Sequence, residues 1–220
     1  MLMATKKKKT SPDILTIFTN AVLENEMFPK SVYKFCKEHD ISESDFYANY
    51  ASIDSLKQAV WMAFYTNTHE LLKKDANFAS LSRKDRLLTF FYTFFEVLLL
   101  NRSYILFVHS SEDNKMNKLG QLKQLRTAVK EFATELIEEG NETKSRFAQN
   151  PVHLFSEATW AQLLLLLNYW VNDSSKGFEK TDALIEKSVT VAFEVFDNTR
   201  LDAFVDLGKF LWKESTSTHN

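Results

Sequence analysis

Apolar side chains recur every three or four positions along most of this chain, which is the spacing of one face of an α-helix. The first such face consists of Ile14, Ile17, Phe18, Ala21 and Val22. The segment Ser11-Pro12-Asp13 before it is a typical helix start, with a capping side chain, a proline in the first turn and an acid near the positive helix end. We therefore predict a helix from Ile14 to about Glu26.

Two shorter helical patterns follow, from Ser31 to Glu38 and from Ser42 to Tyr50, with His39-Asp40-Ile41 between them. Phe46 and Tyr50 are one turn apart and should anchor the second of these helices to the core. Two short helices joined by a turn of about 3–4 residues form a helix-turn-helix, whose second helix enters the major groove of DNA.

The rest of the chain predicts further helices and no strand, because no pattern of period two appears. The expected helices are Ser55–Lys74, Ser82–Leu100, Tyr104–His109, Lys115–Glu139, His153–Val171, Phe178–Phe196 and Arg200–Trp212. Gly140 is expected to end the Lys115–Glu139 helix as a C-cap. The resulting all-α chain divides into a disordered basic arm (1–10), a helix-turn-helix domain (11–54), a helical ligand-binding and dimerisation domain (55–214) and a disordered tail (215–220).

Composition supports this plan and limits the location of the protein. Only 4 Gly and 3 Pro residues occur among 220, which suits helices joined by short links. The single cysteine, Cys36, excludes an intramolecular disulfide and a multi-cysteine metal site, and we expect it to be a small buried hydrophobe rather than a redox sensor. Apolar runs fall far short of the ~20 residues needed to cross a bilayer. We expect a cytoplasmic protein with no membrane insertion.

Charge is distributed unusually for a DNA-binding module. Residues 11–60 contain four lysines and eight acidic side chains, and Glu43 and Asp45 lie in the expected reading helix. Carboxylates repel DNA phosphates, although they can accept hydrogen bonds from cytosine amino groups. The basic run Lys6–Lys9 is either a solubilising tail or an arm that contacts phosphates or the minor groove.

The stretch from Ile14 to Leu56 resembles the DNA-binding part of the tetracycline-repressor (TetR) family of bacterial regulators. The residues that carry the resemblance, in ungapped order, are Ile14-Leu15, Ser31-Val32, Ile41-Ser42, Phe46-Tyr47, Tyr50, Ser52 and Leu56. The resemblance implies a variable helical ligand domain after this stretch, whose last two long helices pair in a homodimer. It also implies a ligand-responsive transcriptional regulator, usually a repressor.

The chain departs from the family pattern at positions that matter for DNA. Glu26 and Asp40 stand where the family has glycines, so we expect a wider turn at Asp40. Glu43-Ser44 replaces a frequent Lys-Gly, Asn49 replaces a basic residue or His, and Ile53 replaces a Lys. The residues that remain for DNA contact by position are Lys6, Lys7, Lys8, Lys9, Lys30, Ser31, Lys34, Ser42, Ser44 and Tyr47.

Aromatic residues in the second domain form either its core or the wall of an elongated apolar cavity. The candidate lining for a small hydrophobic effector is Phe91, Phe94, Phe95, Tyr104, Phe107, His109, Trp160 and Leu164. We expect His109 to be a core or pocket-wall residue. The helix 153–171 is apolar around nearly its whole circumference, so one side should be covered by a second copy or by another helix of the same chain. The candidate dimer residues are Leu163, Leu166, Leu167, Trp170, Val189 and Phe193.

Catalysis finds no support in the sequence. No glycine-rich phosphate loop exists, and the five histidines are scattered without metal-ligand spacing, so we expect no enzyme, no metal and no cofactor. The implied mechanism is a population shift, in which an effector changes the spacing of two reading helices through the helix Ser55–Lys74. The alternative is a TetR-fold protein that has lost DNA binding and acts as a hydrophobic-ligand carrier or protein-interaction scaffold.

Overall fold

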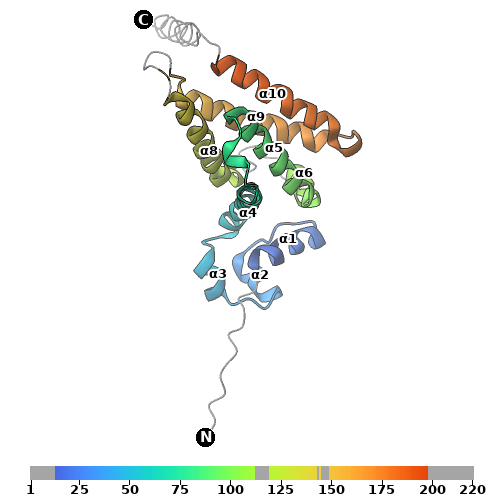
Figure 1. The fold of residues 1–220 in the computed structure, drawn as a ribbon. Coiled ribbons are helices and arrows are strands. Elements are labelled where there is room, and N and C mark those ends of the chain that lie inside the picture. The colour runs from blue at the N-terminus through green and yellow to red at the C-terminus, as the bar shows by residue number, and fades with distance from the viewer. Residues whose placement is uncertain (1–12, 112–118, 143, 145–148, 198–220) are drawn as a thin grey trace, which may run out of the picture. The chain divides into compact units, whose positions relative to one another are not determined.

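The computed structural model describes residues 13–111, 119–142, 144 and 149–197. Every regular element in these ranges is a helix, which confirms the all-α class (Figure 1). The chain forms two compact units. Unit 1 consists of Met1–Thr66 and Leu98–Leu125, and unit 2 consists of Asn67–Val97 and Arg126–Asn220. Each unit therefore combines segments that are far apart in the sequence.

Unit 1 has an aromatic core that joins its first three helices. Its helices are α1 (Ile14–Asn25), α2 (Val32–Glu38), α3 (Glu43–Asn49), the first part of α4 (Ile53–Lys74) and α6 (Arg102–Ser111). Phe18 of α1, Phe35 of α2 and Phe46 of α3 are each completely buried. The ring centres of Phe18 and Phe35 are 5.9 Å apart, and those of Phe35 and Phe46 are 6.2 Å apart. Edge-to-face contacts of this kind add to the burial energy of the rings.

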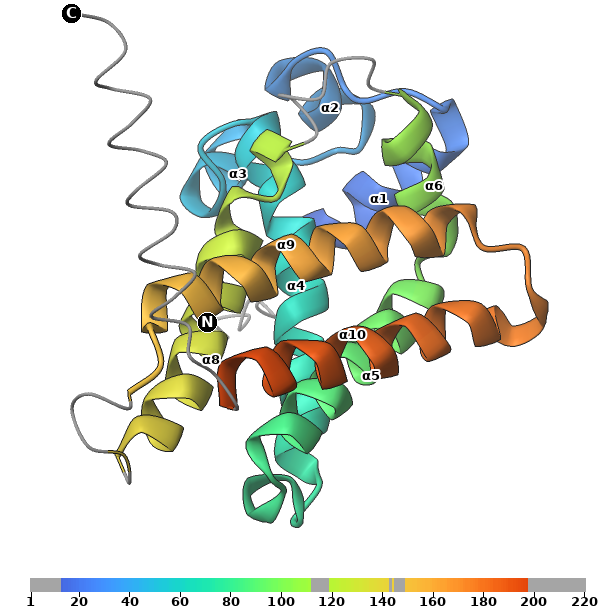
Figure 2. The same cartoon turned by 90° about the horizontal axis from the view of Figure 1, so that it is seen from above.

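Unit 2 is built around a helical pair near the carboxyl end. It contains the end of α4, the 3-10 turn η1 (Phe78–Ser80), most of α5 (Arg83–Leu99) and α8 (Lys123–Asn141), then α9 (Val152–Asn172), η2 (Lys176–Phe178) and α10 (Glu179–Asp197). Helices α9 and α10 run side by side (Figure 2). Phe155 packs edge-on against Phe193 and Phe196, at 5.6 and 5.0 Å between ring centres.

The turn between α9 and α10 is fixed by the buried carboxylate of Asp173. Its oxygens accept hydrogen bonds from the backbone N–H and hydroxyl of Ser175, at 2.9 and 2.7 Å. They accept two more from the backbone N–H and hydroxyl of Thr181, at 3.0 and 2.7 Å. Burial raises the pKa of Asp173, but these hydrogen bonds outweigh it and hold the pKa well below its usual range. The ionised side chain thus caps the start of α10.

Three predicted helix ends differ from the structure. Asp13 rather than Ser11 caps α1, because its carboxylate accepts the backbone N–H of Thr16 at 3.3 Å. The helix predicted over Lys115–Glu139 is interrupted by a turn at Leu122, so α8 begins at Lys123, and Lys115 itself lies outside the described residues. Gly140 was wrongly predicted as a C-cap, because α8 continues through it to Asn141.

Gly140 has a packing role instead of a capping role. A Cβ atom at this position would collide with the guanidinium of Arg83 from α5. The glycine therefore allows an arginine side chain to lie directly on the α8 backbone. The predicted basic arm, the Arg200–Trp212 helix and the carboxyl tail lie outside the described residues.

Among the described helices, none is by itself long and apolar enough to span a membrane. Helices α5 and α6 would reach that length and composition only together, and they are bent by 84° where they meet.

Candidate nucleic-acid interface

Helices α2 and α3 each begin at a serine cap. The hydroxyl of Ser31 accepts the backbone N–H of Lys34 at 3.3 Å, and that of Ser42 accepts the backbone N–H of Asp45 at 3.0 Å. The hydroxyl oxygens of Ser42 and Ser44 lie 2.9 Å apart and share a hydrogen bond. The Ser31 hydroxyl can therefore still donate its proton outward to a phosphate oxygen, whereas only one of the two protons of the Ser42–Ser44 pair stays available.

The turn between α2 and α3 is tight although Asp40 replaces a glycine. Asp40 has a φ of 52°, in the left-handed region, and the backbone N–H of Ile41 donates to the carbonyl of Cys36 at 2.9 Å. This six-residue closure is the arrangement with which glycine commonly ends a helix. The wider turn expected at Asp40 is therefore wrong, because the closing hydrogen bond and the burial of Ile41 hold the aspartate in the glycine conformation.

A left-handed residue also ends α1. Glu26 stands at the other position where the resemblance places a glycine, and its φ is 49°. Both residues thus adopt the left-handed conformation that glycine favours, at the cost of local strain.

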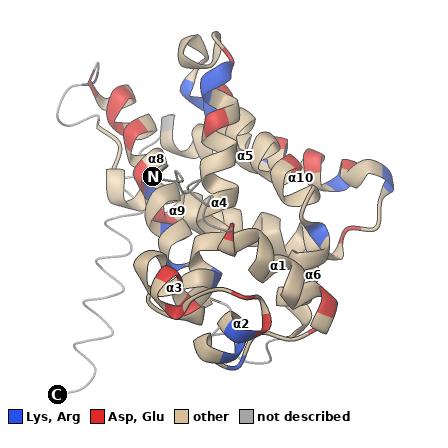
Figure 3. Ribbon diagram, turned by 90° about the horizontal axis from the view of Figure 1, so that it is seen from below, with Lys and Arg blue, Asp and Glu red and all other residues tan. Residues whose placement is uncertain are grey.

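The exposed side of α3 is acidic and polar. Glu43, Ser44, Asp45 and Tyr47 are exposed, the last at 53% of its surface, whereas Phe46 is buried in the core as predicted. Asn49 donates its amide hydrogen to the carbonyl of Asp45 at 2.9 Å. No basic residue belongs to this fully described helix, and the acidic residues are visible on it in Figure 3.

Positive charge gathers instead at the link between α1 and α2. Lys30 and Lys34 are exposed and Ser31 is half-buried. The Lys57 ammonium, which sequence reasoning missed, lies 4.1 Å from the centre of the Phe28 ring and 3.4 Å from the Asp54 carboxylate. The Asp54-to-Lys57 spacing was the only sequence signal for the ion pair. Lys6–Lys9 lie outside the described residues.

Cys36 behaves as predicted for a small buried hydrophobe, with 2% of its surface exposed. Burial raises the pKa of its thiol, and the nearby Glu43 carboxylate raises it further. A thiol with a raised pKa forms little of the reactive thiolate.

The candidate effector residues fall in both units. Phe91, Phe94, Phe95 and Trp160 are buried and Leu164 is half-buried, all in unit 2, whereas Tyr104, Phe107 and His109 belong to unit 1. His109 is exposed at the end of α6, not in a core. No feature of the described residues assigns a ligand to these side chains.

Sequence reasoning missed a half-buried histidine in unit 2. The ring of His69 lies 5.8 Å from that of Phe90 and 5.3 Å from that of Phe132. Burial lowers the pKa of His69, and Lys73 lowers it further. The only sequence signal for this environment was the place of His69 in the helical pattern of the α4 segment. Among the described residues, no group of three His, Cys, Asp or Glu side chains is arranged to hold a metal ion.

The candidate dimer residues lie on the inner side of α9 and α10. Five of them are buried within the chain itself and Leu167 is half-buried; the five are Leu163, Leu166, Trp170, Val189 and Phe193. The exposed apolar side chains of the same two helices are Leu154, Leu165, Tyr169, Val191 and Val195. The six candidates therefore do not form an open apolar surface, whereas these five are accessible.

Comparison with known proteins gives one family. The family described as "Tetracyclin repressor-like, C-terminal domain" matches residues 86–211, which is more than half of the chain. The chain belongs to this tetracycline-repressor-like family. No curated protein matches it in sequence.

Two solved structures share the fold of this TetR-like chain. One, from Syntrophomonas wolfei and assigned as a TetR-family transcriptional regulator, has a TM-score of 0.60 and 15% identity, with 82% of this chain and 91% of that chain covered. The other, from Clostridium perfringens and assigned as a fatty acid metabolism regulator, has a TM-score of 0.50 and 15% identity, with coverages of 84% and 97%. At this identity the likeness concerns the fold alone.

Membership of the TetR family assigns the protein to the transcriptional regulators rather than to the enzymes. The resemblance inferred from residues 14–56 and the match over residues 86–211 agree, although they cover different parts of the chain.

Proposed function

We propose that this TetR-like protein is a ligand-responsive regulator, usually a repressor in this family, that binds DNA through α2 and α3. The observation that carries the proposal is the tight α2–α3 turn. Two short capped helices are held at a fixed angle on a shared aromatic core, although both family glycines have been replaced. A module that had no further need of this geometry would have no reason to keep two strained left-handed residues.

Phosphate contacts would come mainly from α2 and its approach. Lys30 and Lys34 supply charge, and the hydroxyls of Ser31, Ser42 and Ser44 supply neutral donors. Tyr47 adds a phenolic hydroxyl from the exposed side of α3. Lys6–Lys9 extend this set as an arm. With few cations in unit 1, we expect modest affinity and a shallow dependence on salt.

Base contacts would come from the first turn of α3. Carboxylates accept but do not donate, so Glu43 and Asp45 suit the amino groups of cytosine or adenine on the major-groove edge. A bound helix with this charge needs the surrounding lysines to hold it against the DNA backbone.

Effector binding would act through segments shared between the units. Helix α4 begins in unit 1 and ends in unit 2, and α6 belongs to unit 1. The ring of Phe107 in α6 packs edge-on against that of Phe28, with 5.2 Å between ring centres, and Phe28 lies in the link that leads into α2. A hydrophobic effector held in unit 2 by Phe91, Phe94, Phe95, Trp160 or Leu164 would bias the spacing of two reading helices through α4.

We propose that a homodimer forms through the exposed side of α9 and α10. Leu165 and Tyr169 on α9 and Val191 and Val195 on α10 give that side its apolar character. A substitution such as Leu165→Glu should convert a dimer to a monomer, measured by analytical ultracentrifugation, while Glu194→Gln on the same helix pair serves as the control. A monomeric wild-type protein would contradict this interface.

The test of DNA binding is selection from pooled genomic fragments over a series of salt concentrations. A regulator should enrich one operator-like sequence, with half-sites spaced by about one helical turn. Lys34→Gln should weaken binding to all sequences and lower the slope of log affinity against log salt by about 1. No enrichment even at low salt would contradict the regulator function.

A second candidate is favoured by Glu43 and Asp45, which are exposed in the helix that should face DNA. The protein would then be a carrier of a hydrophobic molecule or a scaffold that presents its acidic first unit to a protein partner. Native mass spectrometry of the purified protein tests the carrier. A protein that is empty and takes up neither lipids nor aromatic compounds would contradict it.

A further inference from the structure

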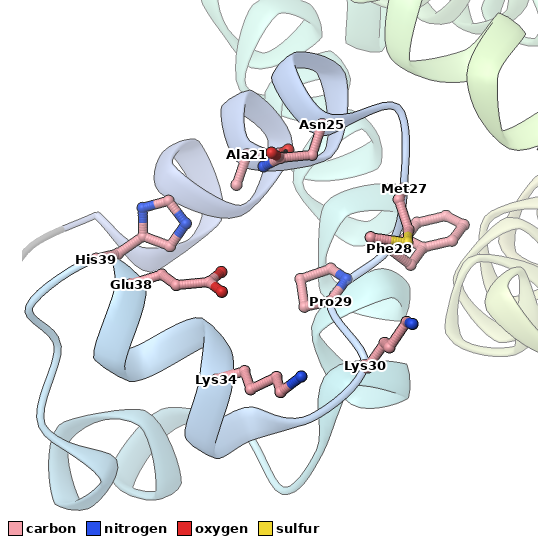
Figure 4. Close-up of a pocket in the computed structure, with 9 residues that line it drawn as sticks. All are labelled: Ala21, Asn25, Met27, Phe28, Pro29, Lys30, Lys34, Glu38 and His39. Atoms are coloured by element: carbon pink, nitrogen blue, oxygen red, sulfur yellow. Dashed lines mark hydrogen bonds between the residues drawn. The ribbon is translucent and has the colours of Figure 1, made fainter.

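A pocket of about 190 Å³ lies in unit 1 between the end of α1 and α2. It is lined by Ala21, Asn25, Met27, Phe28, Pro29, Lys30, Lys34, Glu38 and His39 (Figure 4). A cavity of roughly 150 Å³ is large enough to hold benzene. The pocket can therefore take a small organic molecule, and none of the candidate effector residues lines it.

One wall of the pocket is apolar, and its Phe28 ring is fixed by contacts with neighbouring side chains. Phe28 stacks on Phe18 at 6.3 Å and meets Phe107 edge-on at 5.2 Å. The Lys57 ammonium lies 4.1 Å from the centre of the same ring. These contacts fix the Phe28 ring in place. The part of the ring that stays half-exposed lines the pocket beside Pro29, so an apolar group can pack there without reordering the link between α1 and α2.

The polar groups at the pocket are free to bind. Lys30, Lys34 and Glu38 make no ion pair within the described residues, although all three line the same space. The Asn25 amide nitrogen donates to the Ala21 carbonyl at 2.8 Å, which leaves its oxygen as an acceptor. Two lysines of the four in residues 13–66 thus gather at one pocket, in a region with twice as many acids.

The charges are separated along the pocket. Figure 4 shows Lys30 at the end with Met27 and Phe28, Glu38 and His39 at the other end, and Lys34 between them. An anionic group would therefore meet two ammonium groups next to the apolar wall, with the Glu38 carboxylate at the far end. This arrangement disfavours a ligand with negative charge at both ends.

We propose that this pocket binds a small organic monocarboxylate with a ring or a short apolar chain. The carboxylate lies between the ammonium groups of Lys30 and Lys34, and the apolar part packs on Phe28 and Pro29. Charge-assisted hydrogen bonds from ammonium to carboxylate are stronger than neutral ones. Because both lysines are also phosphate contacts in the proposed function, the bound carboxylate competes with DNA directly.

The test is a titration of the isotope-labelled full chain with benzoate, followed by the amide NMR signals of residues 25–39. We expect saturable shifts with a dissociation constant in the millimolar range. Acetate, which lacks the ring, and benzyl alcohol, which lacks the charge, should each bind at least about fivefold more weakly, since each retains only one of the two contacts. Equal binding of either partial probe would overturn the proposal.

A matched pair of variants locates the site. Lys34→Gln should weaken benzoate binding at least about fivefold by removing one charge-assisted contact. Lys37→Gln removes the same charge from the exposed surface of the same helix, outside the pocket, and should bind as the wild type does. Benzoate shifts that persist unchanged in Lys34→Gln, or no shifts at all, would overturn the proposal.

The competition with DNA rests on the proposed function, but the benzoate titration does not. If the chain binds an operator, benzoate should raise the apparent dissociation constant for DNA in the wild type and in Lys37→Gln, but much less in Lys34→Gln. If it binds no DNA, the titration still decides whether the pocket takes a carboxylate. The two failures are therefore distinguishable.

Discussion

Helices α2 and α3 are built alike but present opposite charges. Each has seven residues, a serine cap and a buried phenylalanine that enters the same core. Outside that core, α2 and its approach carry Lys30, Lys34 and Lys37, whereas α3 carries Glu43 and Asp45. The fold of this module is thus specified by its inner face, while its choice of partner is specified by exposed residues that contribute little to the core.

The acids of α3 also stabilise the helix that they make unfavourable for DNA. Negative side chains in the first turn interact well with the positive end of the helix dipole, by about 0.3–1 kcal/mol each. Stability and phosphate binding therefore make opposite demands on the same two positions.

Loss of the shared aromatic core should have the largest effect on both helices. Phe35→Ala and Phe46→Ala should each lower the free energy of unfolding by about 3–5 kcal/mol, because both rings are completely buried. Urea unfolding with hydrogen exchange at α2 and α3 measures this loss. Tyr47→Ala on the exposed side should change little. A small effect of Phe46→Ala alone would mean that α3 is anchored in some other way.

Charge reversal should make α3 resemble α2. The double variant Glu43→Lys with Asp45→Lys should tighten non-specific DNA binding at low salt by about tenfold or more, and steepen the salt dependence by about 2. Fluorescence anisotropy over a salt series measures both quantities. Glu131→Lys with Glu135→Lys makes the same charge change on exposed α8 positions. If that control tightens binding equally, net charge rather than the site is responsible.

The two caps should prove equivalent. Ser31→Ala and Ser42→Ala each remove a side-chain acceptor for a backbone N–H at a helix start, and each should cost about 1 kcal/mol of stability. Thermal unfolding measures the loss, and threonine at either position should restore most of it. A much larger loss at Ser42 would show that the Ser42–Ser44 hydroxyl pair has a structural role of its own.

The smallest expected effect concerns the turn that joins the helices. Asp40→Gly should raise the free energy of unfolding by about 0.5 kcal/mol, since relief of the left-handed strain is partly offset by the added flexibility of the unfolded chain. Glu26→Gly should gain slightly more, because Asp tolerates this conformation better than Glu does. Thermal unfolding compares the two variants. A loss of stability in Asp40→Gly would mean that the aspartate side chain itself supports the turn.

Local periodicity was sufficient to predict much of unit 1. The burial of Phe46 and Cys36 followed from their spacing, and the serines at 31 and 42 were placed correctly as helix starts. The tight turn at Asp40 could not be predicted, because the preference of a single residue was outweighed by a hydrogen bond and a buried Ile41. Gly140 could not be interpreted either, because its neighbour Arg83 is distant in the sequence.

The surface of α9 marks a different limit. Because α9 is apolar on nearly every side, its sequence contains no period that separates an inner face from an outer one. Leu163 and Leu166 therefore could not be distinguished from Leu165 without the position of α10. DNA contacts and effector lining stay predictions for a related reason, since burial and charge identify accessible groups but not their ligands.

The ring of Phe28 is fixed in place before any partner binds. Phe28 belongs to the irregular link between α1 and α2, yet it contacts side chains from three other segments, Phe18, Lys57 and Phe107. The entropy of ordering this corner is therefore lost when the protein folds, not when it meets a partner. Preorganisation of this kind favours association without requiring any new contact, so even a few lysines at this corner can hold a partner more firmly than their number suggests.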